Sequence, residues 1–479
     1  MTLYRPSFSD FRALALAVGL LAGCKKDVPT APVVPPVVVV VVPPTGTTTT
    51  PPQYGTPFGG VPAREDAVIY QVNIRAFSPG GNLAGVTARL DSIRALHVNV
   101  VYLMPIYPVG AAVAGKPAYN SPYAVRDYRA VNPEFGSLAD LRALVDAAHA
   151  RQMAVMLDWV PNHTAWAHPW LTQHPDWYQQ DAAGSILAVS NNGTTYRDVA
   201  QLNFGNPAMR LEQIAALKSW VYTANVDGFR FDYADFQPAD FWQQATDSLR
   251  RIASHRLLLL AEGTRASNFA SGFDYNFGFG FYDALKSVYR NGAPATNFDA
   301  LAAREYAGAS GTQQVVRYTT NHDVNGSDGT PVAVLGGDAA AMSAFVVAAC
   351  YRGVPMIYNG QEAGMTRGIP FPFTTVKVNW NARPDITRAY RELLAARAGS
   401  PALRHGTATS YSTAAVCAFV KTDGTAQALV LANTRPTAIT YLLPAALANT
   451  TWTDALHGAP VTLGTDVPLP AYGYVVLTR

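Results

Sequence analysis

The feature that most constrains the fold is a regular alternation of apolar strand-like runs with helical patterns, which extends from residue 67 to residue 398. The run 98–104 is almost continuously apolar, as a strand buried on both faces requires. The segment 137–151 has helical spacing, with Ser137 as its predicted N-cap and Asp140 in its first turn. We count eight strands, of which the sixth has the weakest pattern: 67–72, 98–104, 153–160, 227–232, 257–262, 273–276, 315–319 and 354–358.

Parallel strands joined by helical crossovers predict an α/β fold, and the number of strands favours a closed (β/α)8 TIM barrel. A doubly wound open sheet is the alternative. It is disfavoured because no Gly-x-Gly-x-x-Gly motif follows a strand and opens a helix. Predicted helices include 86–96, 206–225, 338–351 and 385–398. After the third strand, residues 162–206 lack clear periodicity, and we expect a small inserted subdomain at about 164–206.

The ends of the chain read differently from the middle. Residues 25–60 are rich in Pro, Val and Thr, a composition that favours an extended linker. Residues 61–400 would form the barrel, and residues 401–479 carry short strand patterns typical of an antiparallel β-sandwich. The strands expected there are 415–421, 426–433, 438–443 and 473–478. Cys350 and Cys417 stand in apolar surroundings and are predicted to be buried thiols.

The first 24 residues have the layout of an export signal. Arg5 and Arg12 precede the apolar run 13–22, which is shorter than the roughly 20 residues of a membrane-spanning helix. The run ends in Leu-Ala-Gly-Cys, which resembles the lipobox of bacterial lipoproteins, with Cys24 as the lipidated residue. We therefore expect an exported protein that is anchored by an N-terminal lipid to a bacterial membrane or cell surface.

Composition excludes several classes of protein. Lys and Arg number 36 against 33 Asp and Glu, so the net charge is only +3, without the basic excess of a nucleic-acid-binding protein. A hydrophobic content of 49% is too high for a disordered chain. Three cysteines in 479 residues do not make a disulfide scaffold.

Charged residues gather at the predicted C-terminal ends of strands, where barrel enzymes carry their catalytic groups. These ends read DWVPNH at 158–163, GFRFD at 228–232, AEG at 261–263 and NHD at 321–323. Several carboxylates, an arginine and two histidines are thereby expected on one face of the barrel. Paired carboxylates, one ionised and one protonated, are what glycoside cleavage requires.

These four blocks resemble the conserved regions of glycoside hydrolase family 13, the α-amylase family, and so do PYAVRDY at 122–128 and GVPMIYNG at 353–360. The resemblance implies that Asp232 is the nucleophile, Glu262 the general acid/base and Asp323 the residue that stabilises the transition state. It also implies a set of residues that bind or orient the sugar and the nucleophile: Tyr123, Asp158, His163, Arg230 and His322.

The activity that the resemblance implies is a retaining hydrolysis of α-1,4-glucosidic bonds in starch or maltooligosaccharides. An α-glucan transglycosylase of the same fold is the alternative, and a non-catalytic glucan-binding surface lipoprotein is a third hypothesis. Nucleic acid and an organic cofactor are not expected. The balance of hydrolysis and transfer, endo or exo attack, preference for α-1,4 or α-1,6 bonds and the oligomeric state stay open at this point.

The chain also departs from the family pattern. Asn162 matches a position that binds calcium in relatives, but Gln201 stands where many relatives carry an aspartate ligand. A neutral amide is a weaker ligand for a hard cation than a carboxylate, so calcium is an open prediction. Asp235 and Phe236 stand where many relatives have a Lys-His pair.

Overall fold

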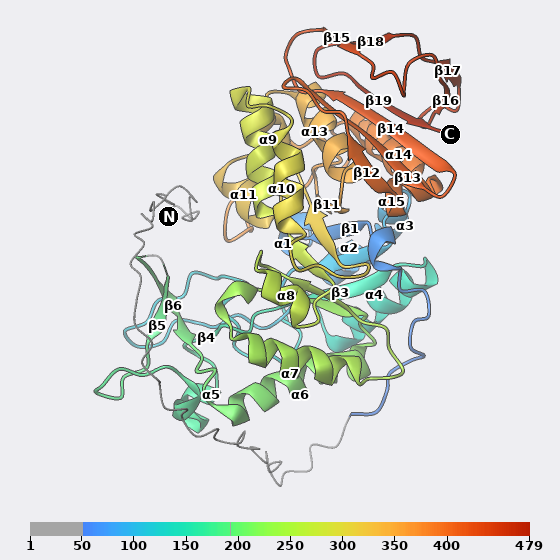
Figure 1. Ribbon diagram of the computed structural model, residues 1–479. Helices are drawn as coiled ribbons and strands as arrows, with labels where there is room; N and C mark the ends of the chain where they lie inside the picture. Colours follow the sequence, from blue (N-terminus) through green and yellow to red (C-terminus); the bar gives the residue numbers. More distant parts are fainter. Residues whose placement is uncertain (1–50, 192) are drawn as a thin grey trace, which may run out of the picture.

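The computed structural model describes residues 51–191 and 193–479, so the predicted signal and Cys24 lie outside the described residues. Eight parallel strands close into a barrel in the order β1-β11-β10-β9-β8-β7-β3-β2 (Figure 1). This confirms the predicted barrel, and every strand lies within three residues of its predicted bounds. The strands are β1 (Ile69–Val72), β2 (Val100–Leu103), β3 (Ala154–Trp159), β7 (Gly228–Phe231), β8 (Leu258–Ala261), β9 (Tyr275–Phe277), β10 (Gln314–Arg317) and β11 (Val354–Tyr358).

Helices cover the outside of the barrel. Ser137 is the N-cap of α4, as predicted, and with Asp140 it forms a reciprocal capping box; the Asn206 side chain caps α6. The single helix predicted over 86–96 is wrong, because the chain leaves helical geometry at Arg89 and forms α2 and α3 instead. The helices are α1 (Ile74–Phe77), α2 (Leu83–Thr87), α3 (Leu90–Arg94), α4 (Leu138–Ala150), α6 (Pro207–Ala224), α7 (Ala239–Arg250), α8 (Ala266–Ala270), α9 (Phe279–Asn291), α10 (Asn297–Glu305), α11 (His322–Ser327), α12 (Pro331–Leu335), α13 (Asp338–Cys350), α14 (Pro384–Gly399) and α15 (Pro401–His405), with one-turn helices η1 (Arg64–Asp66) and η3 (Ala234–Phe236).

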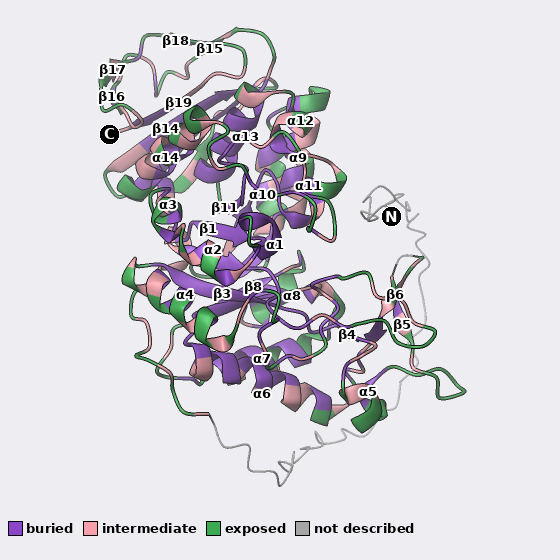
Figure 2. Ribbon diagram, turned by 180° about the vertical axis from the view of Figure 1, so that it is seen from behind, coloured by how far each residue is buried: buried purple, intermediate pink, exposed green. Residues whose placement is uncertain are grey.

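Apolar side chains fill both sides of the barrel wall. In Figure 2 the barrel strands are accordingly coloured as buried. One set, which includes Val100, Met156 and Leu260, points into the barrel, and the other packs under the helices. Burial on both faces explains why the strands read as continuous apolar runs. Polar residues within these strands are therefore exceptions, and Asp158 and Arg230 are two of them, both fully buried.

The predicted insert is a small subdomain between β3 and α6. A three-stranded sheet with the order β4-β6-β5 forms its frame. Its elements are β4 (His163–Ala165), α5 (Trp170–Gln173), the one-turn helix η2 (Pro175–Trp177), β5 (Ala188–Asn191) and β6 (Thr194–Gln201). Because β4 follows β3 after three residues and pairs with β6, the insert rests directly on the carboxyl-terminal rim of the barrel.

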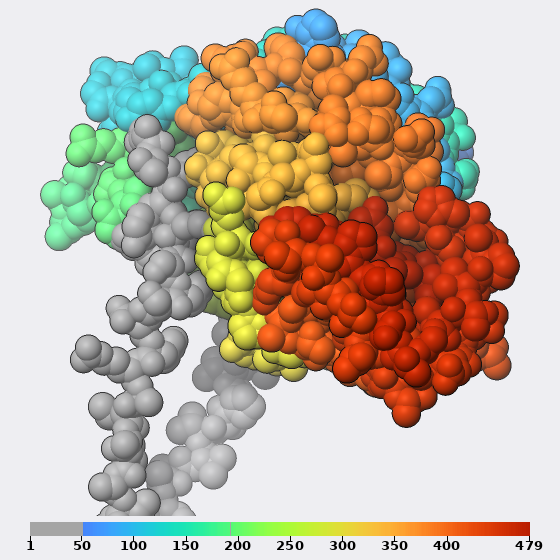
Figure 3. Space-filling view, turned by 90° about the horizontal axis from the view of Figure 1, so that it is seen from above, coloured from blue at the N-terminus to red at the C-terminus, as the bar shows by residue number. Residues whose placement is uncertain are grey.

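The C-terminal region consists of antiparallel sheets, as expected. A six-stranded sheet, β12-β13-β14-β19-β16-β17, and the pair β15-β18 share an apolar core that contains Trp452 and Leu469. The opposite face of the larger sheet packs on the barrel helices, as the contact of the red and orange segments shows (Figure 3). Four short strands escaped the sequence reading: β12 (Thr407–Ser410), β16 (Thr451–Asp454), β17 (Pro460–Thr462) and β18 (Asp466–Leu469). Those that were expected are β13 (Val416–Asp423), β14 (Ala426–Asn433), β15 (Ile439–Leu442) and β19 (Tyr474–Thr478).

The end of the predicted linker belongs to the fold. The Tyr54 N–H donates to the carbonyl of Tyr222 at 2.7 Å, and Asn225 donates to the carbonyl of Thr56 at 2.8 Å. The expectation that the fold begins only at residue 61 is therefore wrong for residues 51–60. Cys350 and Cys417 are both buried free thiols, as predicted. Among the helices of the described part, none has the length and apolar character to cross a membrane.

Candidate active site

The predicted functional side chains come from the carboxyl ends of neighbouring barrel strands. Asp158 on β3 and Arg230 on β7 are register partners across the β3–β7 pair. Asp232 directly follows β7, and Glu262 directly follows β8, which pairs with the other edge of β7. Because neighbouring parallel strands end at the same rim of the barrel, the four side chains meet there.

Arg230 is the centre of this group. Its guanidinium Nη1 lies 2.6 Å from Asp158 Oδ1 and 3.0 Å from Asp232 Oδ1. Its Nη2 forms an ion pair with Glu262. One buried cation thus faces three carboxylates, and full ionisation would leave negative charge uncompensated. Such a cluster retains a proton more readily than free carboxylates do.

The pKa values follow this charge balance. Burial and the charge of Glu262 raise the pKa of Asp232 well above its ordinary value, while Arg230 opposes the shift. Burial raises the pKa of Glu262 as well, against the opposing effect of Arg230. Burial also raises the pKa of Asp158 despite its ion pair. Neighbouring carboxyls that share a proton can supply one acid and one base to a reaction.

Tyr233 connects the predicted nucleophile, the predicted acid and the insert. Its backbone has a φ of 58°, a left-handed conformation that is uncommon outside glycine and often found at functional sites. In this conformation its N–H donates to Glu262 Oε2 at 2.7 Å. Its ring stacks on Phe236 with centroids 3.8 Å apart, and its hydroxyl accepts a hydrogen bond from Asn191 of β5. No sequence motif had pointed to Tyr233.

Asp235, one of the departures from the family pattern, holds the loop that follows Glu262. Its carboxylate accepts hydrogen bonds from the N–H of Thr264 at 2.9 Å and from the side chain of Asn268 at 2.9 Å. A Cβ added to Gly263 would lie 2.1 Å from Asp235 Oδ1, so any larger residue there would displace this carboxylate.

His322 is neutral, and its neighbours fix its tautomer. The Oε1 of Gln71 accepts from the His322 backbone N–H at 3.3 Å, which turns the Gln71 amide nitrogen toward His322 Nδ1 at 2.8 Å. The proton therefore sits on Nε2, which lies 2.6 Å from the Tyr123 hydroxyl. Burial and the charge of Arg230 lower the pKa of His322 to about 4. The result is a neutral N–H donor at the rim of the barrel.

Tyr123 and His163 contact each other in this structure. His163 Nε2 lies 3.2 Å from the carbonyl of Tyr123, and since a carbonyl only accepts, Nε2 carries the proton. Burial lowers the pKa of His163 to about 4. The Tyr123 ring stacks on His322 with centroids 5.4 Å apart, and its hydroxyl donates to Asp158 Oδ2 at 3.0 Å. Asp158 is thus enclosed by protein groups, whereas Tyr123 is only partly buried.

Asp323 stands apart from the buried cluster. Its side chain is 48% exposed and lies 3.3 Å from His322 Nε2. The side chain of Asn321 caps the first turn of α11 and accepts from the N–H groups of Asp323 and Val324, both at 3.0 Å. Two further groups escaped the sequence reading: Gln71, which orients His322, and Tyr102, whose hydroxyl donates to Asp158 Oδ2 at 2.6 Å. Gln71 is a polar interruption of a buried apolar strand, which was the available signal, whereas Tyr102 stands in an apolar run and gave none.

The insert aromatics serve mainly its own packing. Trp177 is buried against Trp170, with centroids 4.9 Å apart, and Trp170 in turn packs on Tyr128. Trp166 is partly exposed and lies under the Lys116 ammonium, which is 3.8 Å from the ring centroid. The helical tryptophans Trp220 and Trp242 are core residues.

The residues around Asn162 do not fit a calcium ion. Calcium takes six to eight oxygen ligands, usually with carboxylates among them. In the described part of the chain there is no cluster of three or more His, Cys, Asp or Glu side chains that could hold a metal. The groups that touch the Asn162 side-chain oxygen are the amide nitrogens of Gln201 and Gln237. The buried Oε1 of Gln237 has no hydrogen-bond partner among the described residues, but one neutral oxygen falls far short of a calcium shell.

Comparison with known proteins shows what this chain is similar to. Residues 45–184 match the family model of the alpha-amylase catalytic domain, a segment that includes β3 but ends before Asp232. The chain is 28% identical over 323 residues to the alpha-amylase MalA of Haloarcula japonica, which covers 64% of this chain and 46% of the relative. It is 34% identical over 186 residues to an alpha-1,4-glucan:maltose-1-phosphate maltosyltransferase of Rhodospirillum rubrum, covering 35% of this chain and 27% of the relative.

The chain therefore spans less than half the length of these two curated relatives. Among solved structures, an alpha-amylase from Lactobacillus plantarum superimposes with a TM-score of 0.74 at 26% identity. That match covers 87% of this chain and 99% of the solved chain, so it extends over the barrel and the C-terminal sheets together.

Proposed function

We propose that this chain, which carries a catalytic domain of the alpha-amylase family, is a retaining α-glucan hydrolase that cleaves α-1,4 bonds in starch or maltooligosaccharides. The observation that carries the proposal is the pair Asp232 and Glu262, bound to one buried guanidinium at the ends of adjacent strands. Retaining glycosidases hold their two carboxyl groups about 5–5.5 Å apart, whereas inverting enzymes need about 6.5–9.5 Å to admit a water. Carboxylates that share a guanidinium support the closer arrangement.

In the first step, the ionised Asp232 attacks the anomeric carbon while Glu262 gives its proton to the leaving glycosidic oxygen. A covalent glycosyl ester forms and the aglycone departs as an alcohol. In the second step, Glu262, now a carboxylate, takes a proton from water, and the resulting hydroxide displaces Asp232. Two inversions at the same carbon give net retention.

The side chains around the two carboxyl groups orient the nucleophile and bind the sugar. Arg230 orients Asp232 and favours its ionised form once Glu262 holds the shared proton. Asp323, the exposed carboxylate, is placed to accept hydrogen bonds from sugar hydroxyls, and the neutral His322 stands beside it, with Nε2 3.3 Å from Asp323 Oδ1. Tyr123 offers a ring beside the reacting sugar, and Asp158 supports Arg230 from behind rather than reaching the sugar. A neutral glucan needs no steering field, in keeping with the small net charge.

The test is the release of reducing sugar from soluble starch and maltooligosaccharides by the purified chain. We expect Asp232→Asn and Glu262→Gln to lower kcat by several orders of magnitude. Asp466→Asn, at an exposed position of β18 in the C-terminal region, is the matched control and should retain full activity. Starch binding without turnover in the unmodified protein would overturn the proposal in favour of a non-catalytic glucan-binding protein.

A transglycosylase is the second candidate, favoured by the 34% identity to a maltosyltransferase. In that case a sugar hydroxyl replaces water in the second step, and the same residues act. Incubation with maltotriose distinguishes the two: hydrolysis gives maltose and glucose, whereas transfer gives products longer than the substrate.

The exported lipoprotein form also stands as a proposal. It is supported by the order of residues in the first 24 positions: two arginines come first, an apolar run follows, and small residues precede Cys24. Cells that express the full chain and are fed a radiolabelled fatty acid should label the unmodified protein in the membrane fraction. Cys24→Ala should abolish the label. An unlabelled protein that is released without its first residues would show an ordinary export signal instead.

A further inference from the structure

The junction between the insert and the catalytic strand is built around one amide group. Gln201 is the last residue of β6, and its backbone register partner is His163 at the start of β4. Asn162 immediately precedes His163 and follows the end of β3. Any group that fixes Asn162 therefore fixes both the base of the insert and the position of His163.

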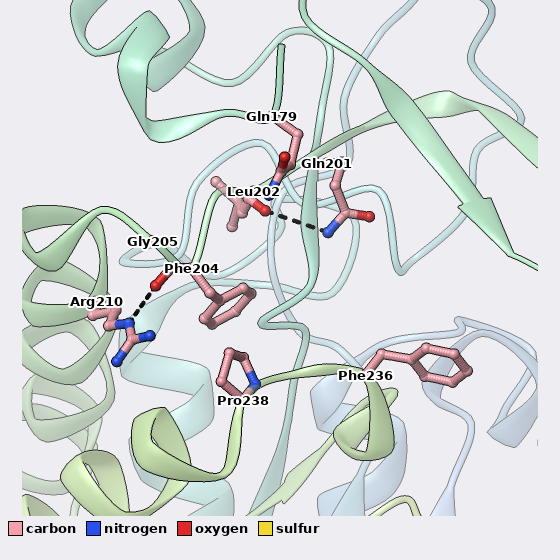
Figure 4. Close-up of a pocket in the computed structure, with 8 residues that line it drawn as sticks. All are labelled: Gln179, Gln201, Leu202, Phe204, Gly205, Arg210, Phe236 and Pro238. Carbon is pink, nitrogen blue, oxygen red and sulfur yellow. Dashed lines mark hydrogen bonds between the residues drawn. The ribbon is translucent and has the colours of Figure 1, made fainter. Parts of the chain in front are cut away.

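The side-chain nitrogen of Gln201 sits among three oxygens of this junction. It donates to the Asn162 carbonyl at 3.0 Å, to Asn162 Oδ1 at 3.0 Å and more weakly to the Leu202 carbonyl at 3.3 Å. Figure 4 shows the Gln201 amide directed at Leu202 on the wall of a pocket of about 350 Å³. A second amide nitrogen, that of Gln237 after η3, reaches Asn162 Oδ1 at 3.1 Å.

The orientation of these amides follows from their partners. Two of the three oxygens are backbone carbonyls, which only accept hydrogen bonds, so the nitrogen of Gln201 must face them. Asn162 must then present its oxygen to Gln201 and Gln237. Its own nitrogen lies 3.3 Å from His163 Nδ1, the ring atom left unprotonated when Nε2 donates to Tyr123. The network is self-consistent and contains no charged group.

Oxygens that converge on one point are the usual surroundings of a hard cation. Here the converging oxygens belong to Asn162 and Leu202, and the group between them is an amide that carries its own hydrogens. We propose that Gln201 occupies the place of a structural cation, so that the insert is fixed to β3 without any metal, and that it acts as a positioning residue for His163. The inference concerns stability and metal dependence, and its test does not depend on the proposed activity.

The experiment measures thermal unfolding of the purified full-length protein in EDTA and in millimolar CaCl2. The unmodified protein should have the same Tm in both and should contain no stoichiometric calcium by elemental analysis. Gln201→Asp places a carboxylate among the carbonyl oxygens, and its Tm should be lower than that of the unmodified protein in EDTA and should rise with calcium. Gln201→Ala should lower Tm by the same amount in both conditions.

Gln179→Asp is the matched control. Gln179 lines the same pocket (Figure 4), and its substitution makes the same change of charge, but among the described residues its side chain forms no hydrogen bond to these carbonyls. Its Tm should not respond to calcium. Loss of stability of the unmodified protein in EDTA, restored by calcium, would overturn the proposal. So would a Gln201→Asp protein without any calcium response, and Gln201→Glu repeats that test should Gln201→Asp fail to fold.

Discussion

Two polar clusters lie four residues apart along the chain at the end of β3, and they are built on opposite principles. Around Asp158, one guanidinium and three carboxylates form a buried charged group with Arg230 at its centre. Around Asn162, the side chains of Gln201 and Gln237 form a neutral amide group. Both are enclosed, but only the first contains groups that change their charge.

The difference in charge suits the two clusters to different tasks: the charged one to proton transfer, and the neutral one to structural support. Buried charge is costly to maintain, and a cluster with more carboxylates than cations is less stable than a fully paired one. The amide network around Asn162 has no ionisation equilibrium, so it holds its geometry at any pH at which the protein folds. The charged cluster thus carries raised pKa values that can serve acid/base chemistry, while the neutral cluster holds the base of the insert.

Removal of the central cation should have the largest effect. Arg230→Met leaves Asp158 buried without its ion-pair partner, and we expect a loss of about 3–5 kcal/mol in the free energy of unfolding at neutral pH. Activity should fall below detection, because Asp232 loses its orienting contact. Urea unfolding and starch hydrolysis measure the two effects.

Arg129→Met is the matched control for that change. Arg129 pairs with Glu212 at 2.8 Å on the surface, and such pairs contribute about 0–1 kcal/mol. An equal loss of stability in both variants would contradict the special position of Arg230.

The next largest effect concerns the acid. In the proposed mechanism Glu262 must hold a proton to act on the leaving group, so activity should decline as pH rises through its raised pKa. Glu262→Gln should lower kcat on starch by about 10²–10⁴-fold. On a maltoside with a 4-nitrophenol leaving group, which needs little protonation, the loss should be smaller and the decline at high pH should disappear. A decline that persists in the variant would assign the proton to another residue.

A smaller effect of opposite sign is expected for the stability of Asp232→Asn. A carboxyl whose pKa is raised in the folded state stabilises the protein only at low pH, and this contribution is lost as pH rises through the folded pKa. Asparagine has no such loss, so the variant should be more stable by about 0.5–2 kcal/mol at pH 7, a range typical of single stabilising changes. The gain should vanish near pH 4, about the ordinary pKa of aspartate. Urea unfolding at the two pH values tests this, and a gain that is equal at both would show that relief of charge is not its cause.

The sequence predicted the charged cluster better than the neutral one. Asp232, Glu262 and Arg230 stand in short motifs at strand ends, so their meeting follows once the strands are known to be parallel. Gln201 and Gln237 meet Asn162 only through the fold of the insert, which has no periodic pattern to read. The role of Tyr233 was not predicted for a similar reason, since its left-handed φ is imposed by its contacts rather than by its residue type. Gly85 and Thr87 in α2 have low helix propensity, which favours a break between α2 and α3. The spacing of apolar residues carries no information about this propensity, so it predicted one continuous helix.

The smallest effect tests whether Asp235 connects the two loops of the catalytic carboxylates. Asp235→Ala removes the acceptor of the Thr264 N–H and the Asn268 side chain, and we expect kcat to fall about tenfold with little change in KM, since the loop after Glu262 loses its support. Gly263→Ala should have a similar effect, because its Cβ would lie 2.1 Å from Asp235 Oδ1. If the carboxylate is the obstacle, the double variant should lose less activity than the product of the two single losses, which a double-mutant cycle on kcat measures. Losses in kcat that simply multiply would show that Gly263 and Asp235 act through different neighbours. An unchanged kcat in Asp235→Ala would show that Asp235 does not support Glu262, and the hydrogen bond from the Tyr233 N–H would then be the contact between the two loops that holds Glu262.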